Sequence, residues 1–259
     1  MSLYTPVDGT PGALAFVGFD NYTYAFERYD GALKVALANS IRFLAIIMCV
    51  GNPIALLLAA LLSSRIRWGA LYRTILFLPT LLSVVIAGWV WQLMLNPLWG
   101  LINKMLVGVG LEAIIPTTGW LGTPGVALIV VALVATWQFL GLSMILFLAA
   151  LISIDDELLD AARVDGASWW SIFWQIRFPL ILPEIGLVVI LTVILNFPAF
   201  DIQQVMGGRN AFLMANLFYY NFARSRTDAA VIGGIMFAIV GAISLIYFAF
   251  FQKRLNRVR

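Results

Sequence analysis

Residues 126–152 read VALIVVALVATWQFLGLSMILFLAALI and contain no charged side chain. The hydrocarbon core of a bilayer is about 30 Å thick, and an α-helix crosses it with about 20 apolar residues at 1.5 Å each. This stretch is long enough and apolar enough to do so. The sequence therefore predicts a membrane-spanning helix here.

Similar stretches lie on both sides of this one. The same length and lack of charge are found in residues 43–62, 74–95 and 229–251. Residues 179–200 carry one charge, Glu184, which lies close enough to the membrane surface to be tolerated. Five such segments would leave no polar surface for a water-soluble domain. We therefore predict an all-α polytopic membrane protein with five spans.

The composition excludes several classes of protein. Hydrophobic residues make up 62% of the chain and charged residues 11%, against about 25% charged in soluble domains. The chain has no histidine and a single cysteine, Cys49, so it cannot build a His or Cys metal site, a Ser-His or Cys-His nucleophile, or a disulfide framework. No pair of aspartates lies inside the spans, as an aspartyl intramembrane protease would need. We expect no enzyme activity, no cofactor and no metal.

The basic residues predict how the chain is oriented. Cytoplasmic loops of membrane proteins are rich in Lys and Arg. Residues 63–73 carry three arginines and no acid, and the tail 253–259 carries four basic residues, so we expect both in the cytoplasm. The loops 96–125 and 201–228 then face outward, and the loop 153–178 faces the cytoplasm. The basic tail is interpreted as a topology signal, so no nucleic-acid partner is expected.

The loop 153–178 reads SIDDELLDAARVDGASWWSIFWQIRF, which is too polar to span a membrane. Ser153 followed by Asp156 resembles a capping box and predicts a helix start, and Ser168 can cap a second, aromatic-rich helix. Gly166 disfavours helix between them. We predict two short helices that meet at Gly166 and lie along the membrane face. By itself this pattern fits either a passive amphipathic connector or a docking element for a soluble partner.

The same loop carries a family resemblance. Asp160-Ala161-Ala162, Gly166 and Phe178-Pro179 have the spacing of the EAA loop in permease subunits of binding-protein-dependent ABC importers. The family consensus begins with Glu and has Leu before the proline. Asp160 and Phe178 depart from it but keep a carboxylate and an apolar residue. The resemblance implies a type I ABC importer transmembrane domain over residues 37–252.

Weaker strings resemble the carbohydrate-uptake branch of that family, the permeases of the maltose and glycerol-3-phosphate type. They are residues 16–22 (FVGFDNY), residues 100–103 (GLIN) and residues 200–208 (FDIQQVMGG). Arg209 stands where this branch usually has proline. The resemblance implies a permease for a sugar or sugar-like solute in the inner membrane of a bacterial or archaeal cell.

The resemblance also implies partners. These are a second permease, an ABC ATPase dimer that holds ATP and Mg²⁺, an external or periplasmic solute-binding protein, and the membrane lipid. This chain has no Gly-x-x-x-x-Gly-Lys-Ser/Thr phosphate loop, so ATP hydrolysis would belong to the partner. The residues expected to couple to the ATPase are Asp160, Ala161, Ala162, Asp165, Gly166 and Ala167.

Polar and aromatic residues inside the spans are candidates for the solute path. They are Trp137, Gln138, Thr192, Asn196 and Gln203. Each could contact solute or form a hydrogen bond between helices. Asn196 leads, because Pro198 predicts a bend beside it. Few carboxylates or arginines lie in the spans, which favours a neutral solute rich in hydroxyls. A polyamine, phosphodiester or peptide importer, and a secondary transporter or channel, remain alternatives.

The number of spans has a consequence for the N-terminus. Five spans with a cytoplasmic C-terminus place residues 1–36 outside. Permeases of this branch usually have six spans with both ends inside, and their Val-Gly-Leu-Asp-Asn-Tyr-like string follows the first span. Here that string begins at residue 16. We therefore expect the chain to be one helix short of the usual core, through a late start site or as a five-span variant.

Overall fold

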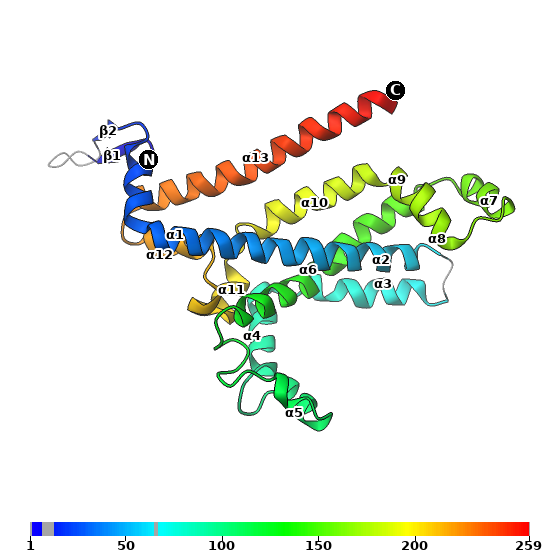
Figure 1. Ribbon diagram of the computed structural model, residues 1–259, viewed down its shortest axis with the longest axis horizontal. Coiled ribbons are helices and arrows are strands. Elements are labelled where there is room, and N and C mark those ends of the chain that lie inside the picture. Colours follow the sequence, from blue (N-terminus) through cyan, green and yellow to red (C-terminus); the bar gives the residue numbers. More distant parts are fainter. Residues whose placement is uncertain (1, 7–12, 65–66, 259) are drawn as a thin grey trace.

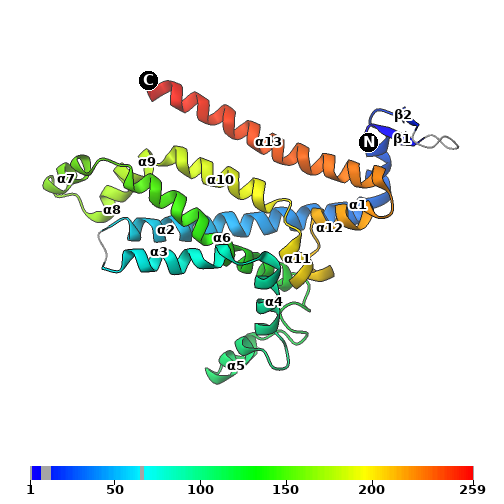
Figure 2. The same cartoon turned by 180° about the vertical axis from the view of Figure 1, so that it is seen from behind.

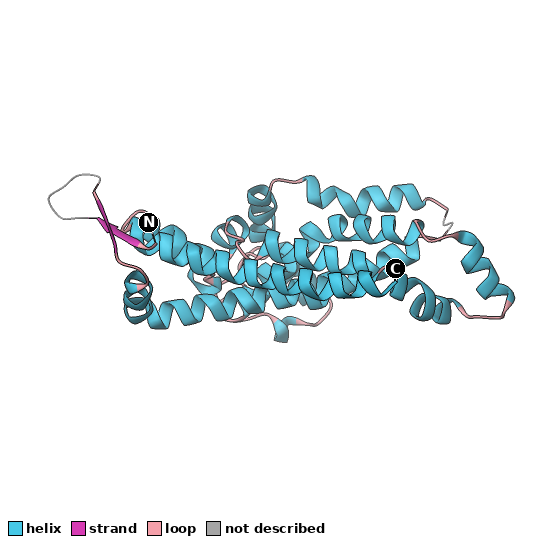
Figure 3. Ribbon diagram, turned by 90° about the horizontal axis from the view of Figure 1, so that it is seen from above, coloured by secondary structure: helices cyan, strands magenta, loops and turns pink. Residues whose placement is uncertain are grey.

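The computed structural model describes residues 2–6, 13–64 and 67–258, and they form an elongated bundle of helices (Figure 1). The N-terminal hairpin of β1 (Tyr4–Pro6) and β2 (Leu14–Phe16) lies at one end of the bundle. The helices α7 (Asp156–Val164) and α8 (Trp169–Ile172) lie at the other end. Viewed from above, almost all of the described chain is helical (Figure 3).

The remaining elements fall into two groups. The first half of the chain forms α1 (Asp20–Ile46), η1 (Ile47–Gly51), α2 (Asn52–Leu62), α3 (Gly69–Phe77), η2 (Leu78–Leu81), α4 (Val84–Met94), α5 (Leu101–Gly108) and η3 (Glu112–Ile114). The second half forms α6 (Val126–Ile152), η4 (Phe173–Arg177), α9 (Phe178–Leu180), α10 (Leu182–Asn196), α11 (Asp201–Met206), η5 (Gly208–Ala211), α12 (Met214–Phe222) and α13 (Arg226–Val258).

The first predicted span is part of a longer helix. The elements α1, η1 and α2 form one helical stretch over Asp20–Leu62 with a kink at Tyr29, whereas the sequence predicted only residues 43–62. Proline has no N–H to donate within a helix, and the wider turn η1 ends two residues before Pro53. Gly51 lies against Thr136 of α6, because a Cβ there would lie 2.9 Å from the Thr136 methyl. This close approach packs α2 on α6.

The second predicted span, residues 74–95, is not one straight helix. The pair α3 and η2 meets α4 at 96°, so α4 points away from the bundle axis (Figure 2). Pro79 lies in the 3₁₀ turn η2, and Leu82 after it has extended backbone. The Thr80 hydroxyl donates to the Gln138 carbonyl at 2.9 Å, and the Gln138 amide donates to the Leu82 carbonyl at 3.0 Å. A charge-free run predicts a segment long enough to cross the membrane, but it does not predict this break. The break is stabilised by these two hydrogen bonds with Gln138 of α6.

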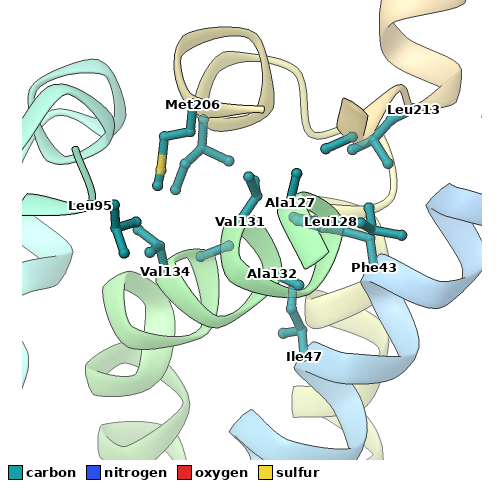
Figure 4. Close-up of a cluster of buried hydrophobic side chains, with 13 residues drawn as sticks. Phe43, Ile47, Leu95, Ala127, Leu128, Val131, Ala132, Val134, Met206 and Leu213 are labelled. Atoms are coloured by element: carbon teal, nitrogen blue, oxygen red, sulfur yellow. The ribbon is translucent and has the colours of Figure 1, made fainter. Parts of the chain in front are cut away.

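The third predicted span is confirmed at both ends, because α6 runs over Val126–Ile152. It is the centre of the bundle, and many of its side chains are buried. Figure 4 shows one cluster in which Val131 and its neighbours on α6 meet Phe43 of α1, Met206 of α11 and Leu213 before α12. This cluster joins segments that are far apart in the sequence.

The last two spans are also helical but differ in their limits. The fourth is bent by 68° between the turns that end at Leu180 and the helix α10. Asn196 is the last residue of α10, so the helix stops before Pro198 where the sequence predicted a bend. The fifth, α13, packs on α10, α12 and α1. Three long apolar helices and two bent pairs thus correspond to the five predicted spans.

A glycine at the break gives a test of this architecture. A Cβ on Gly141 of α6 would lie 2.6 Å from the Leu76 carbonyl oxygen and 2.6 Å from the Phe77 Cα. Gly141→Ala should therefore push α3 away and lower the unfolding free energy by about 1–3 kcal/mol, measured as a lower melting temperature in detergent. A Cβ on Gly241 of α13 meets nothing within 4 Å, so Gly241→Ala is the matched control. Equal melting temperatures for both variants would contradict this packing.

Candidate functional site

The first helix of the 153–178 loop has a different cap from the predicted one. Asp155 caps α7, because its carboxylate accepts from the Glu157 N–H at 2.9 Å. The Ser153 hydroxyl instead donates to the Ala150 carbonyl at 2.8 Å, at the end of α6. The prediction of a Ser153 capping box was wrong. A hydroxyl one residue past a helix end finds a free carbonyl there, whereas Asp155 stands directly before the new helix.

The predicted glycine corner of the loop is confirmed. Gly166 has φ +80°, a left-handed conformation that glycine adopts without a steric cost. The Asp165 N–H bonds to the Ala161 carbonyl at 3.0 Å and the Ala167 N–H bonds to the Ala162 carbonyl at 3.0 Å, which closes the end of α7. A Cβ at Gly166 would meet nothing within 4 Å. Backbone conformation, not space, therefore selects glycine at this corner.

The surface of α7 is largely free. Four of the six predicted coupling residues are exposed (Asp160, Ala161, Asp165 and Gly166), and two are half-buried (Ala162 and Ala167). Leu159 is only 2% exposed and fixes the inner side of the helix. Asp160 forms an ion pair with Arg163. The helix thus presents small, acidic and apolar residues outward at the end of the bundle, with Val164 88% exposed.

The second helix of the loop is held against the bundle. The Ser168 hydroxyl accepts from the Ser171 N–H at 3.2 Å, so the predicted cap is confirmed. Trp169 stacks on Phe173 with ring centroids 5.6 Å apart. Phe173 is buried in a cluster that also contains Ala59 of α2 and Phe147 of α6. The loop therefore combines an exposed first helix with an anchored second one.

An arginine that the sequence analysis did not single out completes this anchor. The Arg177 guanidinium is buried and donates to the Ser63 hydroxyl at 3.0 Å, at the end of α2. Arg73 donates to the Leu62 carbonyl at 2.8 Å at the same helix end. Positive charge is favourable at a helix C-terminus, where carbonyls are free. In sequence, Arg177 looks like one more basic residue of a cytoplasmic loop.

A cavity of about 550 Å³ lies between α7 and the bundle. Its wall includes Leu159 of α7, Leu151 at the end of α6, and Ser63 at the end of α2. This space separates the exposed helix from the spans. The loop is anchored to the bundle by Leu159 of α7, by the aromatic cluster around Phe173 and by Arg177.

Two of the solute-path candidates belong to one network of hydrogen bonds. The Asn196 amide donates to the Thr192 carbonyl at 3.0 Å, and the Thr192 hydroxyl donates to the Val188 carbonyl at 2.8 Å. The Asn52 amide of α2 lies 3.2 Å from the Thr192 hydroxyl. Asn52 was not predicted as a hydrogen-bond partner of Thr192. Its polar side chain inside a charge-free span is the sequence feature that could have indicated this role.

The other three candidates lie outside this network, since no hydrogen bond within the described ranges joins them to it. Gln138 holds the break of the second span. Gln203 is buried, and its amide donates to the Gly208 carbonyl at 2.6 Å. Trp137 is 36% exposed and meets Trp91 edge to face at 5.5 Å. Of the five candidates, Trp137 alone presents an exposed side chain, and all five remain predictions as solute contacts.

The chain is similar to known proteins over most of its length. The family described as binding-protein-dependent transport system inner membrane component matches residues 37–257. An osmoprotective compounds uptake permease of Synechocystis sp. is 31% identical over 84% of this chain and 80% of its own. A lactose transport system permease of Rhizobium radiobacter is 30% identical over 98% and 86%. A diacetylchitobiose uptake system permease of Streptomyces coelicolor is 31% identical over 90% and 69%.

Solved structures share the fold. A bacterial ABC transporter involved in the import of the acidic polysaccharide alginate matches with a TM-score of 0.79 and 24% identity, over 92% of this chain and 84% of the other. An alginate transporter in complex with a pentasaccharide-bound periplasmic protein matches with a TM-score of 0.76 and 23% identity, over 93% and 83%.

A structural role of Gln138 at the break of the second span can be distinguished from a role in contacting solute. Gln138→Leu removes the side-chain donor to the Leu82 carbonyl, so we expect a loss of about 0.5–1.5 kcal/mol of unfolding free energy, seen as a lower melting temperature. Gln92→Leu is the matched control, because Gln92 lies on α4, is exposed and forms no hydrogen bond with the described residues. A Gln138→Leu protein as stable as the unchanged one but altered in transport would favour solute contact instead.

Proposed function

Because this chain belongs to the family of inner membrane components of binding-protein-dependent transport systems, we propose that it is one of two permease subunits of an ATP-driven carbohydrate importer. The observation that carries the proposal is the exposed helix α7, ended by the left-handed Gly166 at one end of the bundle.

The loop 153–178 is proposed as the contact with the ATPase. The exposed Asp160, Ala161 and Gly166 form a small-residue surface that another protein can approach closely. Movement of α7 would reach the spans through α8 and the turn η4 that follows it, whose Arg177 bonds to Ser63 at the end of α2 at 3.0 Å. Binding and hydrolysis of ATP with Mg²⁺ belong to the ATPase partner. The proposed orientation places the loop end of the bundle in the cytoplasm and the β1–β2 hairpin on the outer side of the membrane.

The proposed solute is a carbohydrate delivered by an external binding protein. Relatives with the names lactose, diacetylchitobiose and arabinooligosaccharide permease support this class. The residues in the described spans also support a neutral solute, because Asn52, Thr192 and Asn196 supply hydrogen bonds without charge. Sugars are recognised by such groups and by aromatic faces, which Trp137 and Trp91 provide. An importer for another solute is the alternative.

A second permease is proposed to cover the exposed side of the bent second span. Leu81 before the break is 72% exposed, and Ile86 and Trp89 after it are 59% and 58% exposed. Membrane spans interact with protein as well as lipid, and a backbone break is tolerated where protein covers it or where it lines a cavity. The residues that the structure describes leave this surface uncovered, so we place the second subunit there. The solute path would then run between the two subunits, beside the break.

The test of this function uses two glycines with the same backbone conformation. Gly166 has φ +80° in the loop, and Gly110 has φ +77° after α5, on the segment that the proposal places outside. Both have open space around a Cβ. Gly166→Arg should abolish co-purification of the ATPase subunit and ATP-dependent sugar uptake in proteoliposomes. Gly110→Arg should keep the ATPase bound.

The control separates docking from general damage. Both substitutions place a long cation on a left-handed glycine, so their backbone costs are alike. If both variants or neither lost the ATPase, α7 would not be its docking element. Uptake is measured with a panel of mono- and disaccharides in the presence of the binding protein. If the complex transported a polyamine or a peptide but none of the sugars, the proposed solute class would be wrong. The proposed contact of α7 with the ATPase would be unaffected.

A further inference from the structure

A second cavity, of about 760 Å³, lies toward the end of the bundle away from the 153–178 loop. It is formed by α1, the start of α6 and the turn η5. Two arginines and two asparagines line it together with apolar residues. The lining includes Asn39, Arg42, Ile46, Ile129, Arg209 and Asn210.

The cavity carries uncompensated positive charge. Arg42 and Arg209 are both exposed, and neither forms an ion pair or hydrogen bond with any residue that the structure describes. The described lining contains no aspartate or glutamate. The first turn of α6, beside the cavity, has no side-chain cap and adds partial positive charge of the same sign. An anion is therefore the complementary occupant.

The backbone around the two arginines is held in place. The Asn39 amide donates to the Phe212 carbonyl at 3.0 Å, and the Asn210 amide donates to the Leu121 carbonyl at 3.0 Å. The amide of Gln203 bonds to the Gly208 carbonyl at 2.6 Å, and Gly208 has φ +46°. These bonds fix η5, and with it the position of the Arg209 backbone, against α1 and the loop before α6.

The depth of the cavity matches a membrane surface. Arg42 lies about 20 residues before the cytoplasmic end of the continuous helix at Leu62, which at 1.5 Å per residue is about 30 Å, the thickness of the hydrocarbon core. Ile46 lies one turn deeper on α1, and Ile129 lies within the first turn of α6. The charges are thus at the membrane surface and the apolar part of the lining extends into the membrane.

We infer that this cavity binds an anionic phospholipid, with the headgroup phosphate between Arg42 and Arg209 and an acyl chain along Ile46 and Ile129. Arginine presents a planar fork of donors that matches a phosphate. A choline headgroup would bring a further cation to the two arginines, which favours a lipid with net negative charge. The lining has no aromatic side chain on which a sugar could stack. That the lipid comes from the outer leaflet rests on the proposed orientation.

The test measures which lipid stays bound. The complex is reconstituted in nanodiscs of equimolar phosphatidylglycerol and phosphatidylcholine, re-extracted in detergent, and its bound lipid is counted by native mass spectrometry. The unchanged protein should retain phosphatidylglycerol in preference to phosphatidylcholine. The double variant Arg42→Gln with Arg209→Gln should lose this retention about tenfold, because two solvent-exposed ion pairs with the phosphate are removed and each is weak by itself. Arg224→Gln is the control, an exposed arginine outside the cavity.

Three outcomes would overturn the inference. They are equal retention of phosphatidylglycerol by the double variant, equal retention of both lipids by the unchanged protein, and displacement of the lipid by millimolar glycerol phosphate or galacturonate. The last outcome would assign the cavity to a soluble phosphate or an acidic solute. Retention of phosphatidylglycerol by the variant Arg42→Lys with Arg209→Lys would support a role of positive charge in lipid binding. Binding of the ATPase by the same variants reports on the proposed function separately, since the cavity and the loop lie at opposite ends.

Discussion

No water is available inside a bilayer to bond to a free backbone N–H or C=O, so every interruption of a helix has to be completed by the protein itself. The second span shows how this is done. Its helix stops at η2 and resumes as α4 at 96°, and Gln138 of α6 donates to the Leu82 carbonyl left free at the break. Gly141 gives α3 the room to approach α6. The course of the second span is thus determined by the third.

The same constraint explains where the polar residues of the spans lie. The Asn52 side chain of α2 bonds to the Thr192 hydroxyl of α10, Asn196 donates to the Thr192 carbonyl within α10, and the Gln203 amide donates to the Gly208 carbonyl. These polar groups are therefore already engaged in hydrogen bonds within the protein. Recognition of solute by these groups would need some of the bonds to be exchanged during transport, whereas Trp137 is accessible without any such change.

The sequence predicted the parts of the fold that depend on composition and local backbone chemistry. The third span, the corner at Gly166 and the cap at Ser168 follow from apolar length, a left-handed glycine and a hydroxyl before a helix. It did not predict the 96° break or the bond from Arg177 to Ser63, because both depend on side chains of another span. The choice of Asp155 over Ser153 as cap depends on where α6 ends, which hydrophobicity alone does not specify.

The continuous helix from Asp20 to Leu62 is bonded to other parts of the chain near both membrane surfaces. At one end Ser63 accepts from Arg177 of the loop, and toward the other end Asn39 donates to the Phe212 carbonyl, between η5 and α12. The helix therefore acts as a connecting rod between the two faces of the membrane. Between these two bonds the backbone is helical throughout, with the wider turn η1 as its one departure from α-helix. A bond made or broken at Ser63 and one made or broken at Asn39 would therefore act on the same piece of backbone.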